Sequence, residues 1–142
     1  MTELNLHPQA AASLQRWHEM IDQRDLSALP ELLAADAVFR SPMAHTPYPG
    51  AAVVATILNT VIKVFVDFTY HRQLASDDGL SVVLEFSAKV NGRDLKGIDM
   101  IRFDEQGKIV DFEVMVRPMS GLQALGEEMA RRVGPYLAAA KG

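Results

Sequence analysis

The sequence predicts an α+β fold: a cone-shaped, strongly curved and mostly antiparallel sheet with helices packed on its concave face. Two observations lead to this prediction. Hydrophobic residues recur at helical spacing up to about residue 65 and again after residue 119, whereas between these limits they alternate with polar residues. Turn-forming stretches divide the alternating region into consecutive strands, which is typical of an antiparallel meander. Helices on one face of a curved sheet leave a hollow, and such a hollow is a natural ligand site.

The composition indicates one globular domain over residues 1–142. Hydrophobic residues make up 49% and charged residues 23%, which is sufficient for an apolar core. The net charge is −4 and the basic residues are dispersed, so we expect no nucleic-acid partner. The absence of cysteine excludes disulfides, thiolate catalysis and thiolate metal sites. Because the sequence has neither a signal-peptide pattern nor an apolar run of membrane-spanning length, we expect a cytoplasmic protein without a membrane partner.

Helical spacing dominates the first part of the chain. Leu14, Trp17 and Met20 fall on one face of the first helix, and Pro30 fits the first turn of the second. The predicted elements are a helix at about 8–24, a short helix at 28–36, a strand at 37–42, a loop rich in proline and glycine at 43–50, and a largely apolar helix at 51–65.

Four consecutive strands and one more helix complete the prediction. The strands are expected at 66–76, 80–90, 93–103 and 108–117, joined by the turn sequences DDG, NG and DEQG. The last helix covers about 120–138, with Leu125, Met129 and Val133 on its apolar side. Gly134 and Pro135 are expected to end or kink it.

Three stretches resemble a known superfamily: QRWHEMIDQRDLSALPELLAADAVF, SPMAHTPYPG and, most specifically, GIDMIRFDEQGKIVDFEV. They resemble the nuclear-transport-factor-2-like superfamily, which includes the SnoaL-like polyketide cyclases and ketosteroid isomerase. The resemblance covers about residues 10–117 and implies a cystatin-like α+β roll. The helix from Ser120 onward has no counterpart in ketosteroid isomerase.

The resemblance allows each polar residue of the ketosteroid isomerase site to be checked. The catalytic base of that family, an Asp before a Pro, corresponds to Ser41. Its oxyanion-hole Tyr on the first helix corresponds to Trp17, and a supporting Tyr on the third helix to Leu58. The second oxyanion donor, an Asp in the last hairpin, is kept as Asp99. Since the base is missing, classical ketosteroid isomerisation is not expected.

The alternation of the strands assigns residues to the hollow once Asp99 is taken to point inward. Asp99 is then the one obvious ionisable group of an almost wholly apolar set. The expected ligand-binding residues are Trp17, Phe39, Ser41, Leu84, Phe86, Ile101, Phe112 and Val114. The outward side chains are more polar, and relatives usually dimerise through this outer sheet face, which implies a homodimer.

Asp99 and His45 are the candidate catalytic residues. Burial of Asp99 in an apolar hollow would raise its pKa and suit it to donate a hydrogen bond or transfer a proton. Alternatively Asp99 pairs with a cation, or is a structural carboxylate satisfied by backbone or water. His45 lies near the missing base and could replace it, because histidine titrates near neutral pH; the alternative is an exposed loop histidine. Histidine and carboxylate spacing gives no metal pattern, and no cofactor is expected.

Three functions fit these observations. The first is a cofactor-independent isomerase, cyclase or hydratase that acts on a small apolar carbonyl compound through Asp99. The second is a non-catalytic module that binds a hydrophobic ligand. The third is a dimeric interaction module whose hollow is filled by core side chains. The fold alone does not choose among them, because the same frame can carry many functions.

Overall fold

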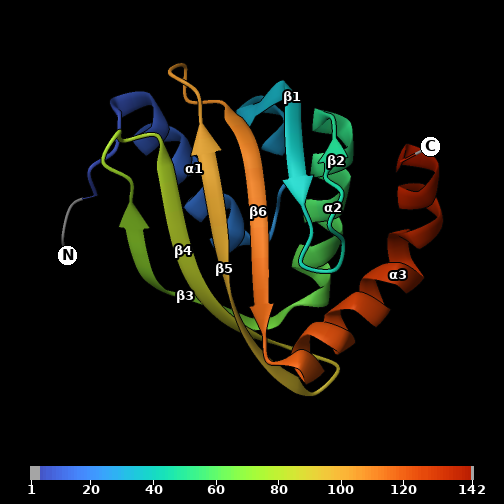
Figure 1. The fold of residues 1–142 in the computed structure, drawn as a ribbon. Coiled ribbons are helices and arrows are strands. Elements are labelled where there is room, and N and C mark those ends of the chain that lie inside the picture. The colour runs from blue at the N-terminus through green and yellow to red at the C-terminus, as the bar shows by residue number, and fades with distance from the viewer. Residues whose placement is uncertain (1–3, 142) are drawn as a thin grey trace.

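A six-stranded sheet and three α-helices form the protein in a computed structural model that describes residues 4–141. The helices are α1 (Pro8–Gln23), α2 (Ala51–Val64) and α3 (Met119–Lys141), with a 3-10 turn η1 (Leu29–Leu32). The strands are β1 (Leu33–Arg40), β2 (Tyr48–Pro49), β3 (Val66–Ala75), β4 (Ser81–Val90), β5 (Arg93–Phe103) and β6 (Ile109–Arg117). Figure 1 shows α1 and α2 on one face of a curved sheet, so the predicted α+β fold is confirmed.

The strands follow the order β2-β1-β6-β5-β4-β3 across the sheet. Strands β3 to β6 form the predicted antiparallel meander. Strand β1 returns to pair in parallel with β6 and antiparallel with β2. In Figure 1, α3 starts at the end of β6 and runs beside α2 and β2.

The predicted helix at 28–36 is wrong in extent. Only Leu29–Leu32 is helical, as a 3-10 turn, and β1 begins at Leu33 rather than at Ala37. Leu33 pairs with Ile109 of β6, and both side chains are buried. Pairing of an apolar strand with the sheet therefore outweighs the helix propensity of the alanines that follow Leu33. The expected loop at 43–50 also contains the short strand β2, which pairs with Val38 and Phe39.

Helix α3 passes through Gly134 and Pro135 instead of ending there. The proline ring clashes with the Cβ of the residue before it, which normally pushes that residue out of helical conformation. Gly134 has no Cβ and avoids this clash. Glu128, on the same helix, is buried and accepts hydrogen bonds from Asn91, Arg131 and Arg132. Because Asn91 belongs to the β4–β5 turn, this carboxylate fastens α3 to the sheet.

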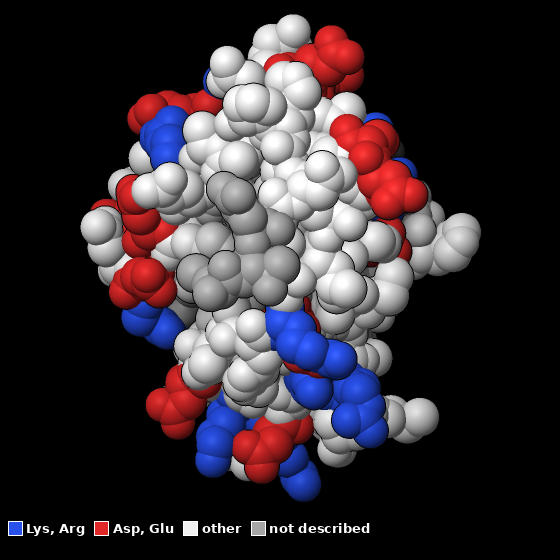
Figure 2. All heavy atoms as spheres, turned by 90° about the vertical axis from the view of Figure 1, so that its left-hand side faces the viewer, with Lys and Arg blue, Asp and Glu red and all other residues white. Residues whose placement is uncertain are grey.

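The predicted facing of the strands is confirmed in the core. Asp99, Ile101 and Phe103 are buried on the inner side of β5, whereas Met100 and Arg102 are partly exposed. On the face that carries β3 and the N-terminus, Figure 2 shows basic side chains with acidic ones beside them. Arg72 of β3 forms an ion pair with Glu85 of β4. None of the described helices is long and apolar enough to cross a membrane.

Candidate functional site

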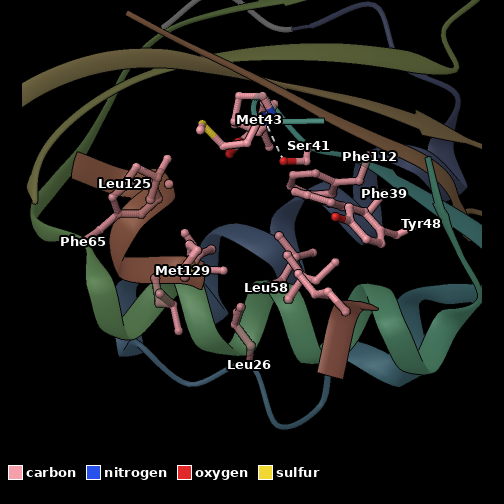
Figure 3. A pocket seen from close by; sticks show the side chains of 18 of the residues that line it. Leu26, Phe39, Ser41, Met43, Tyr48, Leu58, Phe65, Phe112, Leu125 and Met129 are labelled. Carbon is pink, nitrogen blue, oxygen red and sulfur yellow. Dashed lines mark hydrogen bonds between the residues drawn. The ribbon is translucent and has the colours of Figure 1, made fainter. Parts of the chain in front are cut away.

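The inner face of the sheet and the three helices enclose a cavity of about 320 Å³. Its lining is mostly apolar. Figure 3 shows Phe39, Tyr48 and Phe112 on one side and Leu125 and Met129 of α3 toward the other. The other described lining residues are Trp17, Ile21, Leu26, Ser41, Pro42, Met43, Ile57, Leu58, Val61, Ile62, Phe65, Phe68, Tyr70, Asp99, Val114, Gly126, Ala130, Gly134, Leu137 and Ala138. A cavity of this size and polarity is typical of a small-molecule site.

A chain of hydrogen bonds runs from α1 to Asp99. Trp17 Nε1 donates to the Tyr70 hydroxyl at 2.9 Å, and that hydroxyl donates to Asp99 Oδ2 at 2.5 Å. The three side chains come from α1, β3 and β5, and all three line the cavity. Among the described residues nothing else hydrogen-bonds Asp99, so Asp99 Oδ1 is available to a bound molecule.

Aromatic contacts hold Tyr70 in this position. Its ring meets Phe68 edge to face at 4.9 Å between centroids and meets His18 in the same way at 5.3 Å. Phe68 in turn stacks on Phe86 of β4, whose side chain is fully buried. Rings packed in this way fix the direction of the hydroxyl, so the donor to Asp99 is preorganised.

Burial determines the protonation of the pair. Removal from water raises the pKa of Asp99 to about 7, although the hydrogen bond from Tyr70 acts in the opposite direction by stabilising the carboxylate. Burial, and then the charge of Asp99, raises the pKa of Tyr70 well above its usual value, so the phenol stays protonated and remains a donor. Near neutral pH, Asp99 therefore exists in both its acidic and its basic form.

The structure brings six of the ten predicted site residues to the cavity wall: Trp17, Phe39, Ser41, Asp99, Phe112 and Val114. Leu84, Phe86 and Ile101 do not line it and belong to the solid core. The reason is visible at Phe86, which is covered by the rings of Phe65 and Phe68. These inward side chains pack against protein before they reach the hollow.

His45 does not lie at the cavity. Its side chain is exposed and it is absent from the lining, which instead contains Ser41, Pro42 and Met43 from the same loop. The loop turns back on itself at Ser41, whose Oγ accepts a hydrogen bond from the Met43 amide at 3.0 Å. His45 is therefore an exposed loop residue outside the cavity lining.

Sequence reasoning missed Tyr70 and the whole wall that α3 contributes. The signal for Tyr70 was the alternation of Phe68 and Tyr70 on β3, which puts both on the inner face with Asp99. No comparable signal showed that α3 would lie across the hollow. Within the described residues, no group of three histidines or carboxylates lies close enough to hold a metal ion.

Comparison with known proteins assigns the family. The family model described as "SnoaL-like domain" matches residues 14–112. A crystal structure of a steroid delta-isomerase from Pseudomonas aeruginosa is 72% identical, covers 96% of this chain and 99% of its own, and has a TM-score of 0.92. No curated protein matches the chain.

Two further solved structures share the fold. An uncharacterised protein with a cystatin-like fold from Silicibacter pomeroyi is 36% identical over 91% of this chain and 87% of its own, with a TM-score of 0.81. The epoxide hydrolase/cyclase-like enzyme SalBIII, of salinomycin pyran-ring formation, is 18% identical over 83% of this chain and 97% of its own, with a TM-score of 0.66. The chain belongs to the SnoaL-like family.

Proposed function

We propose that this protein is a cofactor-independent enzyme that moves a proton on a small apolar carbonyl compound, as an isomerase or a cyclase does. The observation that carries the proposal is a single carboxyl group, Asp99, held by Tyr70 in an apolar cavity with a pKa of about 7. The name of the 72% identical neighbour supports a ketone with fused rings as one kind of substrate.

The chemistry follows from the two forms of Asp99. In the ionised form, the carboxylate removes a proton from the carbon next to the carbonyl group, and the bond electrons pass to the carbonyl oxygen to give an enolate. The protonated Asp99 then returns the proton to the same carbon or to another carbon of the conjugated system. A pKa near the working pH suits both steps, because neither form is rare.

Tyr70 and Trp17 are positioning residues in this mechanism. Tyr70 holds Asp99 Oδ2, which leaves Oδ1 for the substrate, and Trp17 orients the Tyr70 hydroxyl. The hydrogen bond from Tyr70 also favours the carboxylate. Removal of this hydrogen bond should therefore raise the pKa of Asp99. The rise of the reaction rate with pH, which follows the ionisation of Asp99, should then occur at higher pH.

Exchange of α-protons in heavy water tests the proposal directly. 1-Tetralone is incubated with the protein in D₂O, and loss of its α-proton NMR signal is followed between pH 5 and 9. We expect exchange with the wild type and at least a hundredfold loss in Asp99→Asn. Tyr70→Phe should keep exchange but shift its pH profile upward. Equal exchange by the wild type and Asp99→Asn would refute the role of Asp99.

A non-catalytic binding module is the second candidate, and two observations favour it. Asp99 is the sole carboxyl group among the described lining residues, and Ser41 stands where the resemblance places the base. The same experiment separates the two candidates. Binding of 1-tetralone without exchange at any pH would favour the binding module over the enzyme.

A further inference from the structure

The exposure of the lining residues shows where the cavity opens. Asp99 and the lining residues Trp17, Phe39 and Phe112 are almost completely buried. The exposed members of the lining are Met43, which is 52% exposed, and Ala130 and Ala138 of α3. The path from solvent to Asp99 therefore passes between α3 and the loop that carries Met43.

The α3 side of this path consists of small residues. Gly126, Ala130, Gly134 and Ala138 are four residues apart, so they share one face of the helix, and all four line the cavity. A Cβ added at Gly134 would have no neighbour nearer than the Ala130 Cβ at 4.0 Å, so the helix surface has room for a side chain at this position. From Ala130 to Ala138 the helix rises about 12 Å.

Met43 closes one end of the opening. A Cβ built on Gly126 would lie within 3.0 Å of the Met43 sulfur, because the thioether rests on the bare helix backbone there. Figure 3 shows Met43 above the cavity, on the side of Leu125. At Gly134, by contrast, the nearest described atom to an added Cβ is the Ala130 Cβ at 4.0 Å, and Ala130 itself is exposed.

We propose that the small-residue face of α3, from Ala130 to Ala138, is the entrance of the cavity and sets the size of the molecule that reaches Asp99. Larger side chains at Ala130 or Ala138 would narrow this entrance without disturbing the buried site at Asp99. The inference deepens the proposed function and rests on it for the chemical class of the ligand. It also gives α3, which lies outside the matched family model, a role in specificity.

Two ligand series separate entrance size from carbonyl recognition. The ketones are cyclohex-2-enone, 1-tetralone and anthrone, with one, two and three rings. The hydrocarbons cyclohexene, tetralin and 9,10-dihydroanthracene have the same ring numbers but no carbonyl group. Binding is measured by calorimetry and by quenching of Trp17, the one tryptophan of the chain, which lines the cavity.

The variants are Ala130→Leu and Ala138→Leu, with Ala139→Leu as the matched control. Ala139 is exposed on the same helix but does not line the cavity. Alanine and leucine are both good helix formers, so these changes should leave α3 folded. We expect Ala130→Leu and Ala138→Leu to weaken three-ring ligands at least tenfold and one-ring ligands less than twofold. Ala139→Leu should bind every ligand as the wild type does.

The outcomes distinguish the two proposals. If hydrocarbons bind as well as ketones but the ranking by size holds, the entrance is supported and carbonyl recognition by Asp99 is refuted. If ketones are preferred but the α3 variants weaken all ring sizes equally, or have no effect, the entrance is refuted and the proposed function stands. The entrance proposal would also be overturned if Ala139→Leu weakened the three-ring ligands as much as Ala130→Leu and Ala138→Leu do, or if no ligand of either series bound.

Discussion

The substitution Asp99→Asn should change how stability depends on pH, because Asp99 is buried with a raised pKa. In the unfolded chain an aspartate titrates near 3.8, whereas in the folded protein the pKa is about 7. Between these values the folded state binds a proton that the unfolded state has released. The free energy of unfolding of the wild type therefore falls as the pH rises from about 4 to about 7, and this contribution is constant above pH 7.

The size of the effect follows from the shift of roughly three pKa units. Each unit corresponds to about 1.4 kcal/mol, so ionisation of Asp99 costs the folded wild type about 4 kcal/mol between pH 4 and pH 7. Asparagine does not titrate and loses nothing in this range. Relative to the wild type, Asp99→Asn should therefore gain about 4 kcal/mol of stability from pH 4 to pH 7.5, whatever constant difference the substitution introduces.

Titration of other carboxylates should not obscure the stability change that is due to Asp99 between pH 4 and pH 7.5. Hydrogen bonds from arginine lower the pKa of Glu85 and Glu128 to about 2, and Ser76 and Arg102 do the same for Asp78. Groups with a lowered pKa contribute stability that is lost as the pH falls below about 4.5. Their titration lies on the acid side of the Asp99 window, and it occurs equally in the variant.

Urea unfolding followed by Trp17 fluorescence at half-unit steps of pH measures the difference between the two proteins. Tyr70→Phe is the matched control: it changes the same hydrogen bond but keeps the carboxyl group, so its stability should still fall with pH. A difference between Asp99→Asn and the wild type that stays within about 0.5 kcal/mol from pH 4.5 to 8 would refute a buried Asp99 with a raised pKa.

Two further predictions concern α3 and the outer sheet face. Glu128→Ala should lower the urea midpoint of unfolding clearly more than Glu127→Ala does. The reason is that buried Glu128 joins α3 to Asn91 of the β4–β5 turn, whereas Glu127 is exposed. Equal midpoints for the two variants would contradict this role of Glu128. We also predict a homodimer through the outer face of the sheet, where Met115 of β6 is 45% exposed. Light scattering should give the mass of a dimer for the wild type and of a monomer for Met115→Glu. A monomeric wild type would refute the predicted dimer.

The sheet could be predicted because each strand carries its own pattern. Once Asp99 is taken to point inward, alternation on β5 assigns Ile101 and Phe103 to the same face, and the turn sequences separate the strands. The 3-10 turn at Leu29–Leu32 could not be predicted in the same way. Its alanine-rich continuation favours a helix locally, and only the partner strand β6, far along the chain, decides otherwise.

The site was less predictable than the sheet because a side chain lines a cavity only where no other side chain covers it. Phe86 and Phe112 both point inward, but Phe65 and Phe68 cover the first and leave the second at the cavity. Strand alternation cannot express that difference. Nor does it locate His45, which lies in a loop between strands β1 and β2.

Ser41 offers a test of how far the likeness to ketosteroid isomerase extends. Aspartate at this position would supply the missing base, and its carboxylate could keep the turn by accepting the Met43 amide as Ser41 Oγ does. A second carboxylate would further raise the pKa of Asp99 and leave it as a hydrogen-bond donor to the substrate oxygen. The two carboxyl groups would then divide the work that the proposed mechanism assigns to Asp99 alone.

Conversion of cyclohex-3-enone to cyclohex-2-enone, followed by ultraviolet absorbance, measures the gain. We expect Ser41→Asp to isomerise this ketone at least tenfold faster than the wild type, Ser41→Asn to show no gain, and Ser41→Asp combined with Asp99→Asn to lose most of the gain. Wild-type protein that already matches Ser41→Asp would mean that a group other than residue 41 serves as the base. In that case the missing carboxylate would not distinguish this protein from ketosteroid isomerase, and the name of its 72% identical neighbour would become the better guide to its reaction.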